Sequence, residues 1–208
     1  MKPGMFITLE GGEGVGKTTN LLFIRHWLEQ RGIEVCQTRE PGGTPIAEQI
    51  RALLLGSSDE VITPHAELLL VFAARAQHLQ QTILPALQQG KWVVCDRFTD
   101  ATYAYQGGGR QLDTQLIGWL ENTVQGPLRP DLTLLLDAPV ELGMQRARQR
   151  AELDRFENER QAFFQRVRQA YLQQAAQQPQ RFRVIDASLS LEHVQTAIAT
   201  ALQALLDA

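Results

Sequence analysis

The sequence predicts an α/β protein in which a five-stranded parallel sheet is flanked by helices on both faces. Short runs of aliphatic and β-branched residues alternate along the chain with longer stretches of helical spacing. The runs are almost wholly apolar, as expected of strands that helices cover on both sides. They comprise Phe6 to Leu9, Ile33 to Thr38, Trp92 to Cys95, Leu132 to Asp137 and Phe182 to Asp186.

The composition of the chain fits one globular domain. The chain has 208 residues, 44% of them apolar, and a formal net charge of -3, and we interpret residues 1–208 as a single domain. The negative charge argues against a protein that coats nucleic acid, since such binding needs a surplus of Lys and Arg. The apolar run Met5 to Leu9 is too short for a signal peptide or a membrane span, so we expect a soluble cytoplasmic protein.

The cysteines and histidines do not suggest a metal site. Cys36 and Cys95 each lie in a predicted strand without a second Cys or a His at metal-ligand spacing. The four histidines are scattered along the chain. We therefore expect two buried thiols and no zinc site.

A phosphate-binding motif follows the first predicted strand directly and opens a predicted helix. The segment satisfies the pattern G-x-x-x-x-G-K-[ST] in the context that this pattern requires. Its residues are Gly11, Gly12, Glu13, Gly14, Val15, Gly16, Lys17 and Thr18. The glycines let main-chain N–H groups point at phosphate oxygens, and the helix N-terminus adds partial positive charge. In such a loop Lys17 contacts the β- and γ-phosphates and Thr18 contacts Mg²⁺.

Two Thr-Pro pairs predict the next helices. Thr44-Pro45 and Thr63-Pro64 each place an N-cap residue before a first-turn proline. They predict helices over about 45 to 55 and 64 to 89, joined by a loop over 56 to 60.

Charged residues follow the second and third predicted strands. The second strand ends in the segment Arg39 to Thr44, and the third ends in Asp96-Arg97-Phe98. Ligands of open parallel sheets bind outside the carboxyl ends of the strands. Arg97 could bind a phosphate by two parallel hydrogen bonds, or alternatively form an ion pair with a nearby carboxylate.

The last part of the chain predicts three further helices around the remaining strand. A helix is expected from about Val140 to Arg150, where Arg146 and Arg150 share a face. After the charged stretch 151 to 160, a second helix carries an apolar stripe that includes Phe163 and ends in the Gln-rich segment 173 to 180. A third helix begins near Leu191 and closes the chain.

The phosphate loop alone does not distinguish a motor, a switch GTPase and a small-molecule kinase. Guanine-specific switches carry an Asn-Lys-x-Asp loop, and none of Asn20, Asn122 and Asn158 is followed by Lys. A GTPase is therefore disfavoured. Two alternatives stay open: a kinase for another nucleotide or deoxynucleoside, and a P-loop regulator or assembly protein without a small acceptor.

Four motifs in this order resemble bacterial thymidylate kinases over nearly the whole chain. They are the phosphate loop, Arg39-Glu40-Pro41-Gly42-Gly43-Thr44, Asp96-Arg97-Phe98 and Tyr105-Gln106-Gly107-Gly108-Gly109-Arg110. The resemblance implies a P-loop nucleoside monophosphate kinase-like fold with a short mobile lid at about 148–158. It also implies a homodimer that transfers a phosphoryl group from ATP, with Mg²⁺, to dTMP.

The resemblance implies a set of residues for dTMP. Arg75 would bind the thymine edge, Gln106 and Thr102 would contact the base, and Tyr105 would lie against the deoxyribose. The family often has an aromatic ring where this chain has Val71, so either Val71 packs on the base or Phe72 turns inward, and we favour Val71. The full set is Glu40, Pro41, Arg51, Val71, Phe72, Arg75, Arg97, Thr102, Tyr105 and Gln106. Without the resemblance, Arg75 could equally be a solvated helix arginine, and Thr102 and Tyr105 could merely pack beside a Gly-rich loop.

The resemblance also implies the charges that act in catalysis. Lys17, Arg97 and Arg150 would neutralise the transferred phosphoryl group. The loop carries Glu13 and no Arg, and family members with an acidic loop residue supply lid arginines, which here match Arg148 and Arg150. Glu13 would lie near the sugar 3′-hydroxyl or an acceptor-site water. Thr18 and Asp96 would serve the metal, Asp96 through a bound water or beside Lys17.

Overall fold

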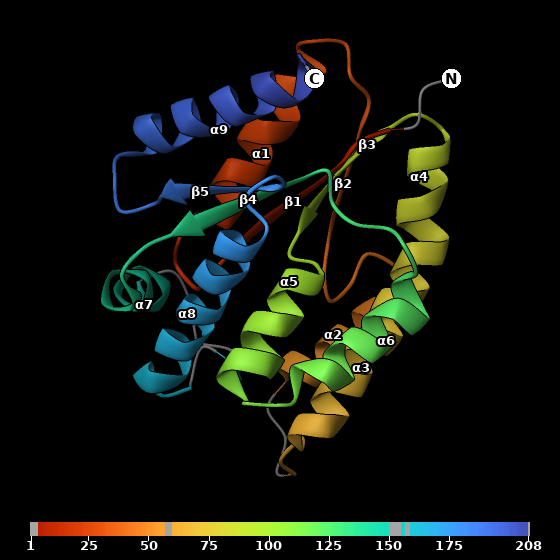
Figure 1. The fold of residues 1–208 in the computed structure, drawn as a ribbon, viewed down its shortest axis with the longest axis vertical. Coiled ribbons are helices and arrows are strands. Elements are labelled where there is room, and N and C mark those ends of the chain that lie inside the picture. The colour runs from red at the N-terminus through yellow and green to blue at the C-terminus, as the bar shows by residue number, and fades with distance from the viewer. Residues whose placement is uncertain (1–3, 57–59, 150–154, 157–158, 208) are drawn as a thin grey trace.

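The computed structural model describes residues 4–56, 60–149, 155–156 and 159–207 of the chain. Its centre is a parallel sheet with the strand order β2-β3-β1-β4-β5 (Figure 1). The strands are β1 Phe6–Gly11, β2 Val35–Arg39, β3 Trp92–Asp96, β4 Leu132–Asp137 and β5 Phe182–Asp186. This sheet confirms the predicted fold class. Because all strands run in the same direction, their carboxyl ends meet at one edge, where Asp96 stands opposite both Leu9 and Arg39.

Two helices cover one face of the sheet. They are α1 Lys17–Glu29 and α9 Leu191–Leu206 (Figure 1). Their buried residues, such as Ile24 and Ile198, form one core cluster with the strand residues Ile7, Leu134 and Ile185. Apolar contacts bury the strands on this side, which agrees with their apolar sequence.

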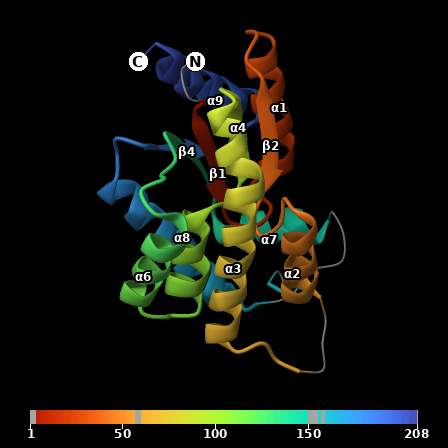
Figure 2. The same cartoon turned by 90° about the vertical axis from the view of Figure 1, so that its right-hand side faces the viewer.

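The other face carries the helices that build the functional edge. They are α3 Pro64–His78, the π-helical turns η1 Leu79–Ile83, α4 Leu84–Gln88, α5 Thr99–Thr102, the π-helical turns η2 Tyr103–Gly109, and α8 Gln161–Gln177. Figure 2 shows α3 and α4 as one long rod, with α6 Thr114–Gln125 and α2 Pro45–Leu55 beside it. The remaining described helix, α7 Val140–Arg148, lies at the carboxyl edge of the sheet.

The predicted helix starts at the Thr-Pro pairs are confirmed. The hydroxyl of Thr44 accepts from the main-chain N–H of Ala47, and that of Thr63 accepts from Ala66. The helix predicted over 64 to 89 is continuous to Gln88 and contains the π-helical turns η1, which the sequence pattern does not reveal. Within the helix predicted over 140 to 150, the described part ends at Arg148, and Arg150 lies outside the described residues.

The Gly-rich segment near Tyr105 is helical and not a loop, which corrects the sequence-based interpretation. Its glycines allow α8 to pack closely against η2. A Cβ atom on Gly108 would lie 2.7 Å from the Cβ of Ala170, and one on Gly109 would lie 2.4 Å from the ring of Phe163. A run of glycines that resembles a flexible turn therefore serves helix packing here.

The two cysteines are free, with Cys95 buried and Cys36 partly exposed. Within the described parts of the chain, no helix is long and apolar enough to span a bilayer.

Candidate active site

The phosphate loop lies between β1 and α1 at the carboxyl edge of the sheet. Gly14 and Gly16 have φ angles of 66° and 87°, a region that favours glycine. A Cβ atom on Gly14 would lie 1.9 Å from the carbonyl oxygen of Gly143 on α7. The loop is therefore shaped by its own backbone and by the close approach of α7.

Lys17, the first residue of α1, folds its ammonium group back onto the loop. Its Nζ donates to the carbonyl oxygens of Gly12 at 2.6 Å and Gly11 at 3.3 Å. Burial and the neighbouring Arg97 lower the pKa of Lys17. A bound phosphate would supply a negative charge that favours the charged form of this lysine.

A cleft of about 410 Å³ opens beside the loop and collects most of the predicted site residues. They come from the loop, the turn after β2, the helices α2 and α3, the end of β3, and α5 with η2. The predicted residues that line it are Glu13, Gly14, Val15, Gly16, Lys17, Thr18, Glu40, Pro41, Arg51, Val71, Arg75, Asp96, Arg97, Thr102, Tyr105 and Gln106.

Arg75 is buried at the floor of this cleft, and one of its donors is not used by the described residues. Its side chain is 1% exposed, its Nε donates to Glu40 at 2.7 Å, and its Nη2 donates to Thr102 at 3.0 Å. The buried Nη1 has no hydrogen-bond partner among the described residues. A buried N–H group without a hydrogen-bond partner lowers the stability of the fold. An acceptor atom of a bound ligand would satisfy this nitrogen. Arg75 is thus not the solvated arginine that the sequence alone left open.

Val71, and not Phe72, faces the cleft. Val71 lines the cavity one turn before Arg75 on α3. Phe72 does not line it but packs with Leu68, Ile117 and Leu120 between α3 and α6. The Phe72 ring also lies 4.8 Å from the Arg75 guanidinium, so it supports that arginine from behind. The structure therefore corrects the assignment of Phe72 to the dTMP-binding residues, because Phe72 does not line the cleft.

Arg97 is held at the end of β3 by oxygens of the protein itself. Its Nη2 donates to Glu13 Oε1 at 2.6 Å, and its Nη1 donates to the carbonyl of Gly11 at 2.7 Å and to Tyr171 at 3.2 Å. The ion pair considered from the sequence is present, and its carboxylate is Glu13. Tyr105 also donates to Glu13 Oε1, at 2.6 Å. Arg97 adopts the left-handed conformation with φ of 65°, uncommon for a residue other than glycine.

A second layer of buried groups stands behind Arg97. Tyr171 donates its hydroxyl to Glu10 at 2.8 Å, and the main-chain N–H of Phe98 donates to the same carboxylate at 2.7 Å. Glu10 is fully buried on β1. Burial and the charge of Asp100 raise the pKa of Glu10 to about 8. No sequence pattern pointed to this group, because a single Glu inside an apolar strand looks like an exception to the pattern.

Asp96 and Thr18 provide the oxygens suited to a metal ion. Both line the cleft, and the buried Oδ1 of Asp96 has no partner among the described residues. Hard oxygen donors of this kind fit Mg²⁺, which usually takes one or two protein ligands and completes its shell with phosphates and water. No cluster of three or more His, Cys, Asp or Glu side chains able to hold a metal occurs in the described segments.

Some predicted residues lie away from the cleft. Gly11 and Gly12 are on the opposite side of the loop, in a small cavity shared with α7 and α8. Arg148 is exposed on α7 and does not line the cleft. Arg150 lies outside the described residues.

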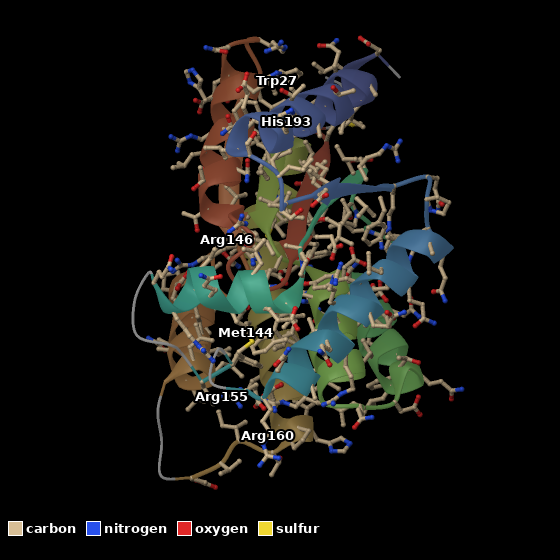
Figure 3. All side chains as sticks on the ribbon, turned by 90° about the vertical axis from the view of Figure 1, so that its left-hand side faces the viewer. Trp27, Met144, Arg146, Arg155, Arg160 and His193 are labelled. Atoms are coloured by element: carbon tan, nitrogen blue, oxygen red, sulfur yellow. The ribbon has the colours of Figure 1, made fainter. Side chains whose placement is uncertain are left out.

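Other cleft residues were not among the predicted site residues. Arg146 on α7 lines the cleft and donates to the carbonyl of Ala187 at 2.9 Å, thereby linking α7 to the turn after β5 (Figure 3). Phe156 lines it from beyond α7, and its ring packs edge-on against Tyr105 at 5.9 Å. The sequence offered one indication that Arg146 belongs to the site, namely that it shares a helix face with Arg150. For Phe156 no local pattern existed.

The parallel sheet, the phosphate loop and the arginine-lined cleft define a P-loop phosphotransferase of the nucleoside monophosphate kinase class. The family model described as thymidylate kinase matches residues 9–198. The chain belongs to the thymidylate kinase family.

Individual relatives agree with this assignment. The chain is 64% identical over 201 residues to the thymidylate kinase of Chromohalobacter salexigens, covering 96% of this chain and 95% of that protein. It is 61% identical over 203 residues to that of Pseudomonas putida, covering 98% of both. The solved structure of thymidylate kinase from Ehrlichia chaffeensis superposes with a TM-score of 0.78 at 35% identity, covering 97% of this chain and 99% of that one.

Proposed function

We propose that this cleft carries out the reaction of the thymidylate kinase family, the transfer of the γ-phosphoryl group of ATP to dTMP to give dTDP and ADP. The observation that carries the proposal is the buried Nη1 of Arg75, which has no partner in the described part of the chain and lies in the same cleft as the phosphate loop. One end of the cleft offers main-chain amides and Lys17 to a polyphosphate. The other end offers a buried guanidinium donor to a carbonyl.

The donor end suits the triphosphate of ATP. The amides of residues 11 to 18 and the N-terminus of α1 would bind the phosphates, with Lys17 exchanging its carbonyl partners for phosphate oxygens. Thr18 and Asp96 would hold Mg²⁺, the latter directly or through water. When bound, Mg²⁺ supplies positive charge to the phosphates. Arg146 lies beside the turn after β5, a position that suits contact with the purine base.

The acceptor end suits a thymine nucleotide. Arg75 would donate to the ring carbonyl, Val71 would pack against the base, and Gln106 and Thr102 complete the edge that reads it. Tyr105 would lie against the deoxyribose. Glu40 holds Arg75 and is also bonded to His78 at 3.0 Å, while the Pro41 carbonyl accepts from Arg51 at 2.9 Å. Arg51 and Arg97 are then the acceptor-phosphate ligands.

The chemistry needs no general base, because the acceptor phosphate is already an anion at neutral pH. Catalysis consists of holding two polyanions in line and neutralising the charge between them. Among the cations that line the cleft, Lys17 belongs to the phosphate loop of the donor end, and Arg97 lies at the end of β3 as a ligand for the acceptor phosphate. A lid at about 148–158 that adds Arg150 and excludes water remains a prediction, as does ATP binding by Arg148. So does the assignment of Glu13 to the sugar hydroxyl or an acceptor-site water.

A panel of monophosphates tests this function. ADP formation and the diphosphate product would be measured with ATP, Mg²⁺ and each of dTMP, dUMP, dCMP, dGMP and AMP. We expect dTMP to be the best acceptor. A preference for dCMP or AMP would assign a different nucleotide kinase, and ATP hydrolysis indifferent to every acceptor would assign a P-loop regulator.

Two broader properties belong to the same proposal. The apolar residues Ile46, Leu53, Leu69 and Trp119 are more than half exposed on α2, α3 and α6. They support a homodimer formed through these helices. A single domain over 1–208 and a cytoplasmic location also remain predictions.

A further inference from the structure

Glu67 is a buried carboxylate that the reaction above does not use; it lies behind the acceptor end of the cleft and is bonded to Gln106, which lines that cleft. It is 0% exposed and lies on α3, four residues before Val71 and eight before Arg75. Residues at this spacing share one face of a helix. One face of α3 therefore carries a carboxylate, an apolar side chain and a guanidinium in sequence, and the last two of these line the cleft.

Four donor nitrogens fix the two oxygens of Glu67. Oε1 accepts from Gln106 Nε2 at 2.8 Å. Oε2 accepts from Arg155 Nη2 at 2.6 Å and from Arg110 Nη2 at 3.1 Å, and Arg110 Nε lies 3.2 Å from Oε1. Every one of these neighbours is a donor, so the site fits a carboxylate, which only accepts. The two guanidinium groups compensate its charge and prevent the carboxylate from turning.

This arrangement decides which way the amide of Gln106 points. Gln106 is 3% exposed and lines the cleft from η2. Because Glu67 offers only acceptors, the amino group of Gln106 must face it. The reversed amide would place a carbonyl oxygen against a carboxylate oxygen with no proton between them. The carbonyl oxygen of Gln106, which has no partner among the described residues, is therefore left for a ligand.

Two such links join α3 to the helical segment of α5 and η2. Arg75 bonds to Thr102, and Glu67 bonds to Gln106. Val71 lies between them on α3 and lines the cleft. A planar base that packs on Val71 would thus meet a donor from Arg75 and, next to it along the same edge, an acceptor from Gln106.

We propose that Glu67 is a positioning residue for acceptor specificity, which keeps the carbonyl oxygen of Gln106 toward the base and thereby selects a base with an N–H at ring position 3. The proposal rests on the function proposed above. Thymine and uracil carry a donor at N3 and a carbonyl at C4. Cytosine carries an acceptor at N3 and an amino group at C4. A carbonyl oxygen of Gln106 held in this direction can therefore accept a hydrogen bond from N3–H of thymine or uracil. It would face the N3 lone pair of cytosine, which disfavours binding of that base.

The test is the ratio of kcat/KM for dTMP to kcat/KM for dCMP in Glu67→Gln. An amide at position 67 can present its own N–H to Gln106 and so allow the Gln106 amide to turn. We expect the ratio to fall at least about tenfold, the effect of roughly one mispaired hydrogen bond. The dTMP to dUMP ratio should stay within about twofold, because both bases carry the N3 donor.

These ratios separate positioning from a purely structural role. Each ratio is measured on one preparation, so the fraction of folded enzyme cancels. Glu121→Gln is the matched control, since Glu121 is a buried carboxylate on α6 that accepts from Tyr103 at 2.7 Å, away from the cleft. It should leave both ratios at the wild-type values.

A restoring variant sharpens the test. In Glu67→Gln/Gln106→Glu the carboxylate moves to position 106, where it can accept from the amide introduced at position 67 and still turn an acceptor toward the base. We expect the dTMP to dCMP ratio to recover. If Glu67→Gln does not fold, Glu67→Asp keeps the charge and withdraws the carboxylate from Gln106, and it should lower the same ratio.

The proposal is overturned if folded Glu67→Gln, or Glu67→Asp in its place, keeps the wild-type dTMP to dCMP ratio. It is also overturned if the dTMP to dUMP ratio falls by as much, since that would indicate general distortion of the pocket. Failure of the proposed function is distinguishable, because wild-type enzyme would then not convert dTMP in the same assay.

Discussion

At the scale of single residues, Arg75 gives the most direct test of the acceptor site. Arg75→Ala should weaken dTMP binding by about a hundredfold, because a charged hydrogen bond in a buried site contributes roughly 1.5–3 kcal/mol. ATP binding should change little, since the phosphate loop does not contact Arg75. Isothermal titration with each nucleotide measures both. An equal loss for ATP and dTMP would mean that Arg75 only supports the fold.

Glu10 predicts a pH dependence of stability. Its pKa is raised from an ordinary value of 4.5 to about 8 by burial and by Asp100. The folded protein therefore holds this proton between about pH 4.5 and 8 where the unfolded chain has released it. The contribution of Glu10 to the free energy of unfolding is complete below about pH 4.5 and is lost as pH rises toward 8. The free energy of unfolding then falls by at most about 1.4 kcal/mol per pH unit.

Urea unfolding across this pH range measures the slope. In Glu10→Gln the component that belongs to Glu10 should disappear, whatever the change in overall stability. An unchanged slope in that variant would show that another group is responsible. Exposed carboxylates provide a control, since Glu192→Gln on α9 should leave the slope as in the wild type.

The sequence indicates the cations of the site better than their partners. Lys17 and Arg97 follow from short motifs at the ends of strands. The sequence allowed an ion pair of Arg97 with a carboxylate, but the choice of Glu13 as its partner, at 2.6 Å, could not be predicted, because it depends on how β1 and β3 align. Glu67 and Glu10 were missed for a similar reason, since each is a lone acidic residue within an apolar pattern. Their roles arise only from donors that lie far away along the chain.

At the scale of elements, patterns located the strands and most of the long helices, but they did not predict α5 or α6, nor the local geometry of the helices. The strands β4 and β5 coincide with the predicted ranges, since runs of aliphatic residues between turns are strong signals. The π-helical turns η1 and η2 were not predicted, because one added residue shifts the 3.6-residue pattern by a single position, which a short run of apolar residues does not resolve. The glycines of η2 suggested a loop, because their partner surface on α8 lies far away in the sequence.

Gly108 tests whether those glycines serve packing. Gly108→Ala should lower the free energy of unfolding by about 1–3 kcal/mol, since the new methyl group would lie 2.9 Å from the main-chain oxygen of Arg166. Gly107→Ala is the matched control, because its nearest contact, at 3.3 Å, is the flexible end of Ile117. Chemical unfolding measures both variants. Equal stability of the two would argue that α8 can shift without cost.

At the scale of the whole molecule, the sheet brings together residues whose order along the chain is known from the sequence but whose proximity in space is not. The cleft unites the phosphate loop with residues of α3 and η2, although Lys17 and Gln106 lie far apart along the chain. The direction of each strand was predictable, and so was the edge at which the site lies. The volume of the cleft and the direction of Val71 required the packed helices.

The exposed apolar surface of α2, α3 and α6 predicts self-association. Leu69 is 58% exposed on α3. Leu69→Glu should convert a dimer into a monomer, because a charge in an apolar interface is costly to desolvate. Leu22→Glu is the control, since Leu22 is 50% exposed on α1. Sedimentation equilibrium gives the mass of each. A monomeric wild-type protein at micromolar concentration would rule out this interface.

The pairing of Lys17 and Arg97 with the protein's own oxygens has a consequence for how nucleotides arrive. Arg97 is ion-paired with the Glu13 carboxylate and Lys17 is hydrogen-bonded to the carbonyl oxygen of Gly12, so both project less field into solution than bare charges would. Nucleotide capture then proceeds by exchange at close range, and long-range attraction contributes little. Its association rate should accordingly vary little with ionic strength.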